Sequence, residues 1–142
     1  MRNTLLFKSE IFNNSEPREY FINDCCFCDY LAAWLKQSLE QKSYSIGEPI
    51  QEDWGWLLSV EKGGSRFHLN IGYVPKPDDL WEVIVEPCAS LFKRLTGVNQ
   101  ATEMKRLCLD LHEVVSGKER NGIITWLQID GRGVESDESE AP

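Results

Sequence analysis

The sequence predicts an α+β fold, a two-layer sandwich in which two main helices cover one face of an antiparallel sheet of four or five strands. Two segments repeat apolar residues at spacings of three and four, which is typical of amphipathic helices. Three consecutive runs are rich in β-branched and aromatic residues. Only short, turn-rich segments separate these runs, whereas parallel crossovers need about a dozen residues or more. The runs therefore suit an antiparallel meander.

The first two predicted elements are a strand and a helix. Residues Thr4 to Phe12 precede a polar turn and predict a first strand, which we place at an edge of the sheet. Asn23 or Asp24 can cap the helix that follows, and this helix is expected to end near Lys42. Its apolar side chains recur at helical spacing: Phe27, Tyr30, Leu31, Trp34, Leu35 and Leu39.

The predicted meander contains three strands, over Trp54 to Glu61, Arg66 to Tyr73 and Leu80 to Glu86. A hairpin turn at Gly63-Gly64 joins the first two, and a proline-containing loop over 74–79 joins the second and third. Alternation along each strand predicts one apolar face and one polar face. The polar face collects the side chains of His68, Asn70, Glu82 and Glu86, together with Ser59 and Glu61.

The remaining elements are helical, then extended. Residues Cys88 to Leu95 suit a short helix closed by Gly97. A second amphipathic helix is expected over Ala101 to Ser116, followed by a final strand over Ile123 to Ile129.

The length and composition indicate one domain. A chain of 142 residues, 42% of them hydrophobic, is near the usual size of a domain with a single core. We expect a single domain over 1–131. Residues 132–142 are almost free of apolar side chains and rich in acids, so this tail is expected to be disordered.

The charge balance restricts the classes of ligand. The chain carries 15 Lys plus Arg against 23 Asp plus Glu, a formal net charge of −8. Phosphate backbones and anionic lipids repel such a protein, so neither nucleic acid nor a membrane is an expected partner. Lys8 interrupts the apolar start before a signal sequence would be complete, and five cysteines fit reduced thiols, which together indicate a cytoplasmic protein.

The most unusual local feature is the run Glu52-Asp53-Trp54-Gly55-Trp56. Exposed indoles beside carboxylates form a recognition patch for a basic partner, because the aromatic rings supply contact area and the acids engage Lys or Arg. The alternative is that both indoles pack into the core and the acids close a turn. If the patch is accessible, the next loop would add to it. The expected partner-binding residues are Glu52, Asp53, Trp54, Trp56, Asp78, Asp79 and Trp81.

Catalytic and metal chemistry find little support in the sequence. Cys25, Cys26 and Cys28 lack a second pair at zinc-site spacing, and Cys25 and Cys28, one helical turn apart, are expected to act as small buried hydrophobes. His68 lies on the predicted polar sheet face without a recognisable nucleophile, and His112 is expected at a helix surface. We therefore assign no catalytic residue, no metal site and no cofactor.

The helix containing Asp29-Tyr30-Leu31-Ala32-Ala33-Trp34-Leu35, then Gly47-Glu48-Pro49-Ile50, then the Glu-Asp-Trp-Gly-Trp run, resembles a loose group of small bacterial proteins with no established activity. The likeness covers about residues 20 to 86 and implies a bacterial accessory protein. In size and charge the chain is also similar to immunity proteins that neutralise toxins.

The sequence thus favours a small acidic protein-binding module, such as an immunity or inhibitor protein that docks a basic partner. The alternative is a small-molecule sensor or an enzyme with a pocket between sheet and helices, in which His68 and Glu82 are the polar groups. The oligomeric state is left open.

Overall fold

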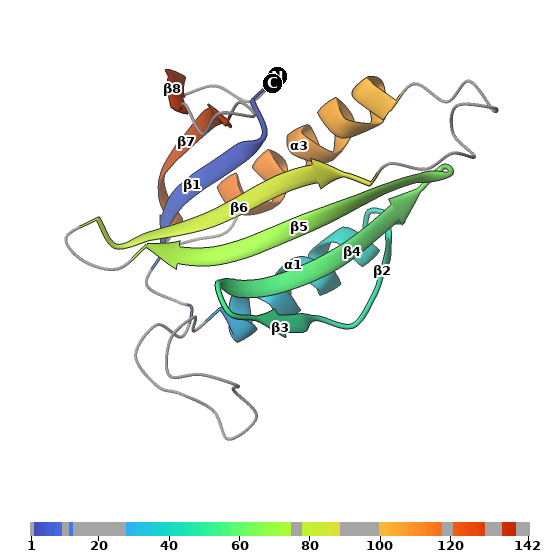
Figure 1. Ribbon diagram of the computed structural model, residues 1–142, viewed down its shortest axis with the longest axis horizontal. Helices are drawn as coiled ribbons and strands as arrows, with labels where there is room; N and C mark the ends of the chain where they lie inside the picture. Colours follow the sequence, from blue (N-terminus) through green and yellow to red (C-terminus); the bar gives the residue numbers. More distant parts are fainter. Residues whose placement is uncertain are drawn as a thin grey trace.

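A computed structural model describes residues 2–9, 12, 28–74, 78–88, 100–117, 121–129 and 135–138. They form an antiparallel sheet with two helices on one face (Figure 1). In chain order the elements are β1 (Thr4–Ser9), α1 (Asp29–Glu40), β2 (Ser45–Ile46), β3 (Ile50–Glu52), β4 (Gly55–Lys62), β5 (Ser65–Val74), β6 (Leu80–Pro87), α3 (Gln100–Ser116), β7 (Asn121–Ile129) and β8 (Glu135–Glu138).

The sheet is larger than predicted. Within the described residues it has eight strands in the order β2-β4-β5-β6-β1-β7-β8, and β3 also pairs with β4. The strands β2 and β3 pair with opposite ends of β4, so they share one position at that edge. The five predicted strands correspond to β1, β4, β5, β6 and β7, and the three additional ones are short segments of two, three and four residues.

The first strand is not at an edge, and this part of the prediction is wrong. β1 lies between β6 and β7 and pairs with both. Its alternate side chains Leu5 and Phe7 are fully buried. A strand with neighbours on both sides and two buried apolar side chains belongs to the interior of the sheet, far from its sequence neighbours.

Four residues of the acidic C-terminal tail lie within the described part of the chain. Residues Glu135–Glu138 form β8, which pairs antiparallel with β7. Ladder hydrogen bonds need only main-chain groups, so an acidic segment can extend a sheet when an edge strand is available. Two other predictions, the Asn23 or Asp24 cap and the helix over Cys88 to Leu95, concern residues that lie almost entirely outside the described ones.

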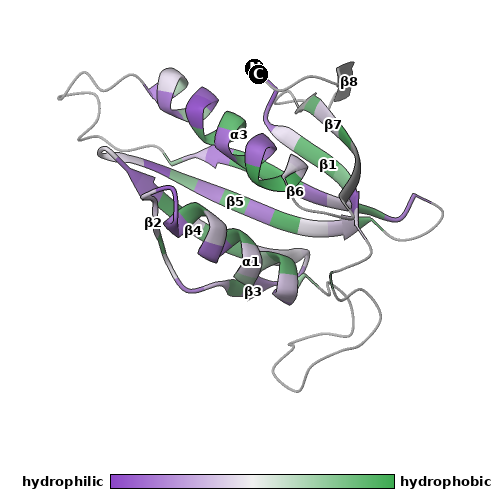
Figure 2. Cartoon of the chain, turned by 180° about the vertical axis from the view of Figure 1, so that it is seen from behind, coloured by the Kyte–Doolittle hydropathy of each residue, from purple (hydrophilic) through white to green (hydrophobic). Residues whose placement is uncertain are grey.

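Both helices pack on the same face of the sheet, as the view from behind shows (Figure 2). α1 packs on β2 and β4, while α3 packs on β5, β6 and β7. Strand alternation sends one set of side chains into this layer. The core formed there includes Leu5, Phe7, Leu31, Leu35, Leu39, Trp56, Leu58, Leu69, Ile71, Trp81, Val83, Leu107, Leu111 and Trp126.

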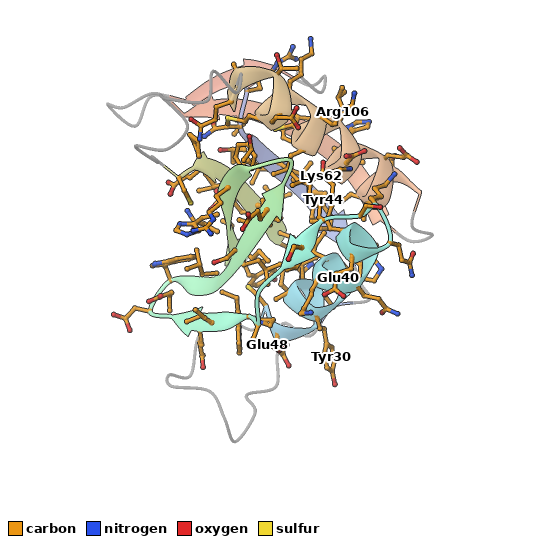
Figure 3. All side chains as sticks on the ribbon, turned by 90° about the vertical axis from the view of Figure 1, so that its right-hand side faces the viewer. Tyr30, Glu40, Tyr44, Glu48, Lys62 and Arg106 are labelled. Atoms are coloured by element: carbon orange, nitrogen blue, oxygen red, sulfur yellow. The ribbon has the colours of Figure 1, made fainter. Side chains whose placement is uncertain are left out.

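A polar cluster ties the two helices to the sheet near the C-terminal end of α1. The Tyr44 hydroxyl donates a hydrogen bond of 2.5 Å to Oδ2 of Asp110 on α3. Lys62 Nζ lies 4.4 Å from the centre of the Tyr44 ring and donates to the carbonyl of Lys42 (Figure 3). Burial, and secondly the bond to Asp110, raise the pKa of Tyr44 above its ordinary value.

Neither described helix has the length and apolar content that a membrane span requires.

Candidate functional site on the open sheet face

The second face of the sheet carries no described helix, and strand register shows which side chains it presents. On β5 and β6, His68 lies opposite Glu86, Asn70 opposite Ile84, and Gly72 opposite Glu82. His68, Asn70, Glu82 and Glu86 therefore lie on one face of the sheet. Apolar side chains also belong to this face, because Leu57 pairs with Asn70 on one side and Leu6 pairs with Glu82 on the other. We call this surface the open face.

One end of the open face gathers the predicted acids around an indole. Trp54 lies in the turn before β4, and its side chain is 48% exposed. Pairing of Trp56 with Ile71 and of Val74 with Leu80 brings the β3–β4 turn and the β5–β6 loop to the same end of the sheet. The residues from these two connections and the adjacent strand end are named the acidic-aromatic rim: Glu52, Asp53, Trp54, Asp78, Asp79 and Glu82.

Two glycines hold the rim close to the sheet. A Cβ on Gly55 would lie 2.0 Å from the carbonyl oxygen of Ile71, and the φ of Gly55 is +154°, so β4 can start here only without a side chain. A Cβ on Gly72 would lie 3.7 Å from the main-chain oxygen of Trp54 and 3.7 Å from Oε1 of Glu82. The Trp54 backbone and the Glu82 carboxylate therefore flank the same bare patch of β5.

Two predicted rim residues belong to the core instead. Trp56 is 7% exposed and Trp81 is 0% exposed, so neither side chain can supply contact area to a partner. Trp81 donates a hydrogen bond of 3.2 Å from Nε1 to the carbonyl of Ser9. The centre of its ring lies 4.7 Å from the centre of the Tyr73 ring. Both indoles pack in the core, on the face of the sheet that the helices cover.

The acids of the rim differ in their exposure to solvent. The Tyr73 hydroxyl donates a hydrogen bond to the carboxylate of Asp79, which fixes Asp79 against β5. Asp53 and Asp78 are exposed, whereas Glu52 and Glu82 are partly buried. Ile50, which the sequence did not single out, is 51% exposed beside Glu52 on β3.

The opposite end of the open face is hollow. Near the β4–β5 hairpin a cavity of about 630 Å³ is lined by three residues of the predicted polar face, Ser59, Glu61 and His68, and by others that the sequence did not single out. Its polar lining side chains are Ser45, Ser59, Glu61, Arg66, His68 and Cys88. A small-molecule sensor or enzyme was the alternative hypothesis, with a pocket between sheet and helices. The described lining of this cavity contains no helical residue. A second cavity, of about 410 Å³, lies between the C-terminal ends of α1 and α3 and is lined partly by Trp34 and Glu113.

The thiols and imidazoles do not assemble into a metal site within the described residues. Cys28 and Cys108 are buried, Cys88 is partly exposed, and none of the three forms a disulfide. Burial raises the pKa of the Cys108 thiol to about 12. His112, expected at a helix surface, instead accepts a hydrogen bond of 3.0 Å at Nδ1 from Nε1 of Trp126. Cys25 and Cys26 lie outside the described residues.

Comparison with protein-family models, with curated proteins and with solved structures finds no match to this chain.

Proposed function

We propose that the protein is a stoichiometric binding protein, of the immunity or inhibitor kind, that docks a basic protein partner through the acidic-aromatic rim. The observation that carries the proposal is a half-exposed Trp54 indole among five carboxylates at one end of an open sheet face.

Trp54 suits the role of an anchor. Tryptophan is enriched among the residues that dominate binding energy, because a rigid ring buries a large area at low entropic cost. An exposed indole is also a favourable surface for a Lys or Arg side chain. The residue after Trp54, Gly55, lies close against the Ile71 carbonyl of β5, so the turn that carries Trp54 packs tightly on the sheet.

The carboxylates suit a basic partner. Charges of one sign at one end of a surface accelerate the encounter with an oppositely charged protein and select against acidic ones. The net charge of −8 adds to this effect at long range. Asp53 and Asp78, as the exposed acids of the rim, are expected to contribute most to the rate of association.

Affinity capture from cells that produce the protein tests this proposal. The wild-type chain should recover a basic protein at a one-to-one ratio, and Trp54→Ala should lose it. A basic partner recovered equally well by Trp54→Ala would contradict the proposal.

Matched controls locate the effect. Leu109 on α3 is 47% exposed, so Leu109→Ala removes an exposed apolar side chain from the helical side and should still capture the partner. Asp53→Lys/Asp78→Lys should fail, whereas Glu40→Lys/Glu103→Lys makes the same change in net charge on the helices and should retain capture.

A further inference from the structure

The cavity at the hairpin end of the open face has the features of a small-molecule site. Its volume of about 630 Å³ falls within the range of ligand pockets, roughly 300 to 1,000 Å³. Three strands and the residue that follows a fourth strand build it. Ser45 of β2 pairs with Glu61 of β4, Glu61 pairs with Arg66 of β5, and the N–H of Cys88, just after β6, donates to the carbonyl of Arg66 at 3.0 Å.

Small residues leave the space empty. Three of the residues that line the cavity are small: Ser45, Gly47 and Ser59. Arg66 and His68 of β5 line it as well. The N–H of Gly47 donates a hydrogen bond of 2.9 Å to the carbonyl of Ser59, and a Cβ on Gly47 would lie 3.6 Å from that of Ser59. A side chain at Gly47 therefore fits the backbone but would occupy the cavity.

Arg66 supplies hydrogen-bond donors that suit an anionic group. Its Nε donates to Oε2 of Glu61 at 3.1 Å, which holds the guanidinium by one edge. The two terminal nitrogens, which no described residue engages, form the pair of donors that binds a carboxylate in a bidentate manner. Two serine hydroxyls and the His68 ring add further hydrogen-bonding groups on the same face.

Acids beside these donors favour a ligand that also carries a positive charge. Glu61 lines the cavity, and Glu86 lies directly opposite His68 on the neighbouring strand. These carboxylates, with the net charge of −8, disfavour a dianion such as phosphate. They would accept hydrogen bonds from an ammonium group placed a few ångströms from a carboxylate bound by Arg66.

We propose that this cavity binds a small zwitterionic metabolite of the amino-acid class, with its carboxylate on Arg66 and its ammonium group on Glu61 or Glu86. This site lies at the opposite end of the open face from the acidic-aromatic rim and does not depend on the rim binding a protein.

Alkylation of Cys88 provides a direct readout, because Cys88 lines the cavity and is partly exposed while Cys28 and Cys108 are buried. The full chain is treated with iodoacetamide in the presence of single amino acids at millimolar concentration, and the rate at Cys88 is followed by peptide mass spectrometry. At least one amino acid should slow alkylation and raise the thermal unfolding midpoint. No protection and no thermal shift by any amino acid would overturn the proposal.

Two variants and two ligand controls locate and define the site. Arg66→Gln should weaken protection roughly tenfold or more, since it removes a charge-assisted pair of hydrogen bonds. Gly47→Val should abolish protection, because its side chain would occupy part of the cavity. Arg106→Gln, on exposed α3 surface, should protect like the wild type. Equal protection in Arg66→Gln, or equal protection of the wild type by acetate or inorganic phosphate, would show that the proposed ligand class is wrong.

Discussion

Trp126 and His112 join β7 to α3 through a hydrogen bond of 3.0 Å from the indole Nε1 to the imidazole Nδ1. The Trp126 side chain is fully buried, and the two rings stack with their planes at 27°. Because Nδ1 accepts this bond, the imidazole carries its proton on Nε2. The histidine therefore acts as a structural acceptor in this protein.

Replacement of His112 tests that role. His112→Phe keeps a ring but leaves the buried indole N–H without an acceptor, so the free energy of unfolding should fall by about 1–3 kcal/mol. Leu109→Ala, on the exposed side of the same helix, should change it by no more than about 0.5 kcal/mol. Urea unfolding measures both. A change for His112→Phe as small as that of the control would rule out a buried bond.

The two neighbouring tryptophans of the Glu-Asp-Trp-Gly-Trp run should respond in opposite ways. Trp56→Ala should destabilise the fold by about 3–5 kcal/mol, because it empties a core position. Trp54→Ala should leave stability within about 0.5 kcal/mol, since the side chain is half exposed. Chemical denaturation of each variant decides the point, and similar losses for both would contradict the exposed position of Trp54.

Gly55 should tolerate no side chain. Gly55→Ala would place Cβ 2.0 Å from the Ile71 carbonyl oxygen, a main-chain atom that cannot move without breaking the β4–β5 pairing. Overpacking of this kind costs roughly 1–3 kcal/mol or more, and the positive φ adds strain. Gly47→Ala meets only ordinary contacts and should be nearly neutral. Thermal unfolding that ranks Gly47→Ala as the more damaging change would refute this account of the turn.

Stability should decline at alkaline pH. Burial raises the pKa of Cys108 to about 12, whereas the thiol in the unfolded chain titrates near about 8.5. Between these values the folded state binds more protons than the unfolded state, so the free energy of unfolding falls as pH rises. The raised pKa of Tyr44 acts in the same direction above about pH 10.

Cys108→Ala separates the thiol from other causes of this decline. The variant loses stability at neutral pH through its smaller side chain, but from about pH 8.5 upward its stability should fall less steeply than that of the wild type. Urea unfolding across this range compares the two slopes. Parallel slopes would show that the buried thiol does not contribute.

The sequence predicted the longer elements because their periodicity extends over many residues. The helix α3 and the strands β4, β5, β6 and β7 appear close to their expected bounds, whereas α1 begins at Asp29, later than the predicted start after Asn23 or Asp24. β2, β3 and β8 are too short for a period to be visible, and the central position of β1 depends on pairing with residues more than 70 positions away.

The tryptophans show why burial was harder to predict. Residues two apart in a strand share a face, so Trp54 and Trp56 read as equivalent. Trp54 in fact lies in the turn, β4 begins at Gly55, and only Trp56 enters the core. The cavity could not be predicted from the sequence for a different reason. Its lining residues Ser59, His68 and Cys88 share no sequence motif and are brought together by the pairing of the strands.

Association kinetics with the captured partner test the central proposal most directly. The rate constant of the wild-type chain should be high at low salt and fall as salt is added, while that of Asp53→Lys/Asp78→Lys should be lower by roughly tenfold or more at low salt and depend less on salt. Glu40→Lys/Glu103→Lys provides the control for net charge alone. A rim double variant that associates as fast as this control at every salt concentration would show that the acidic-aromatic rim is not the docking surface.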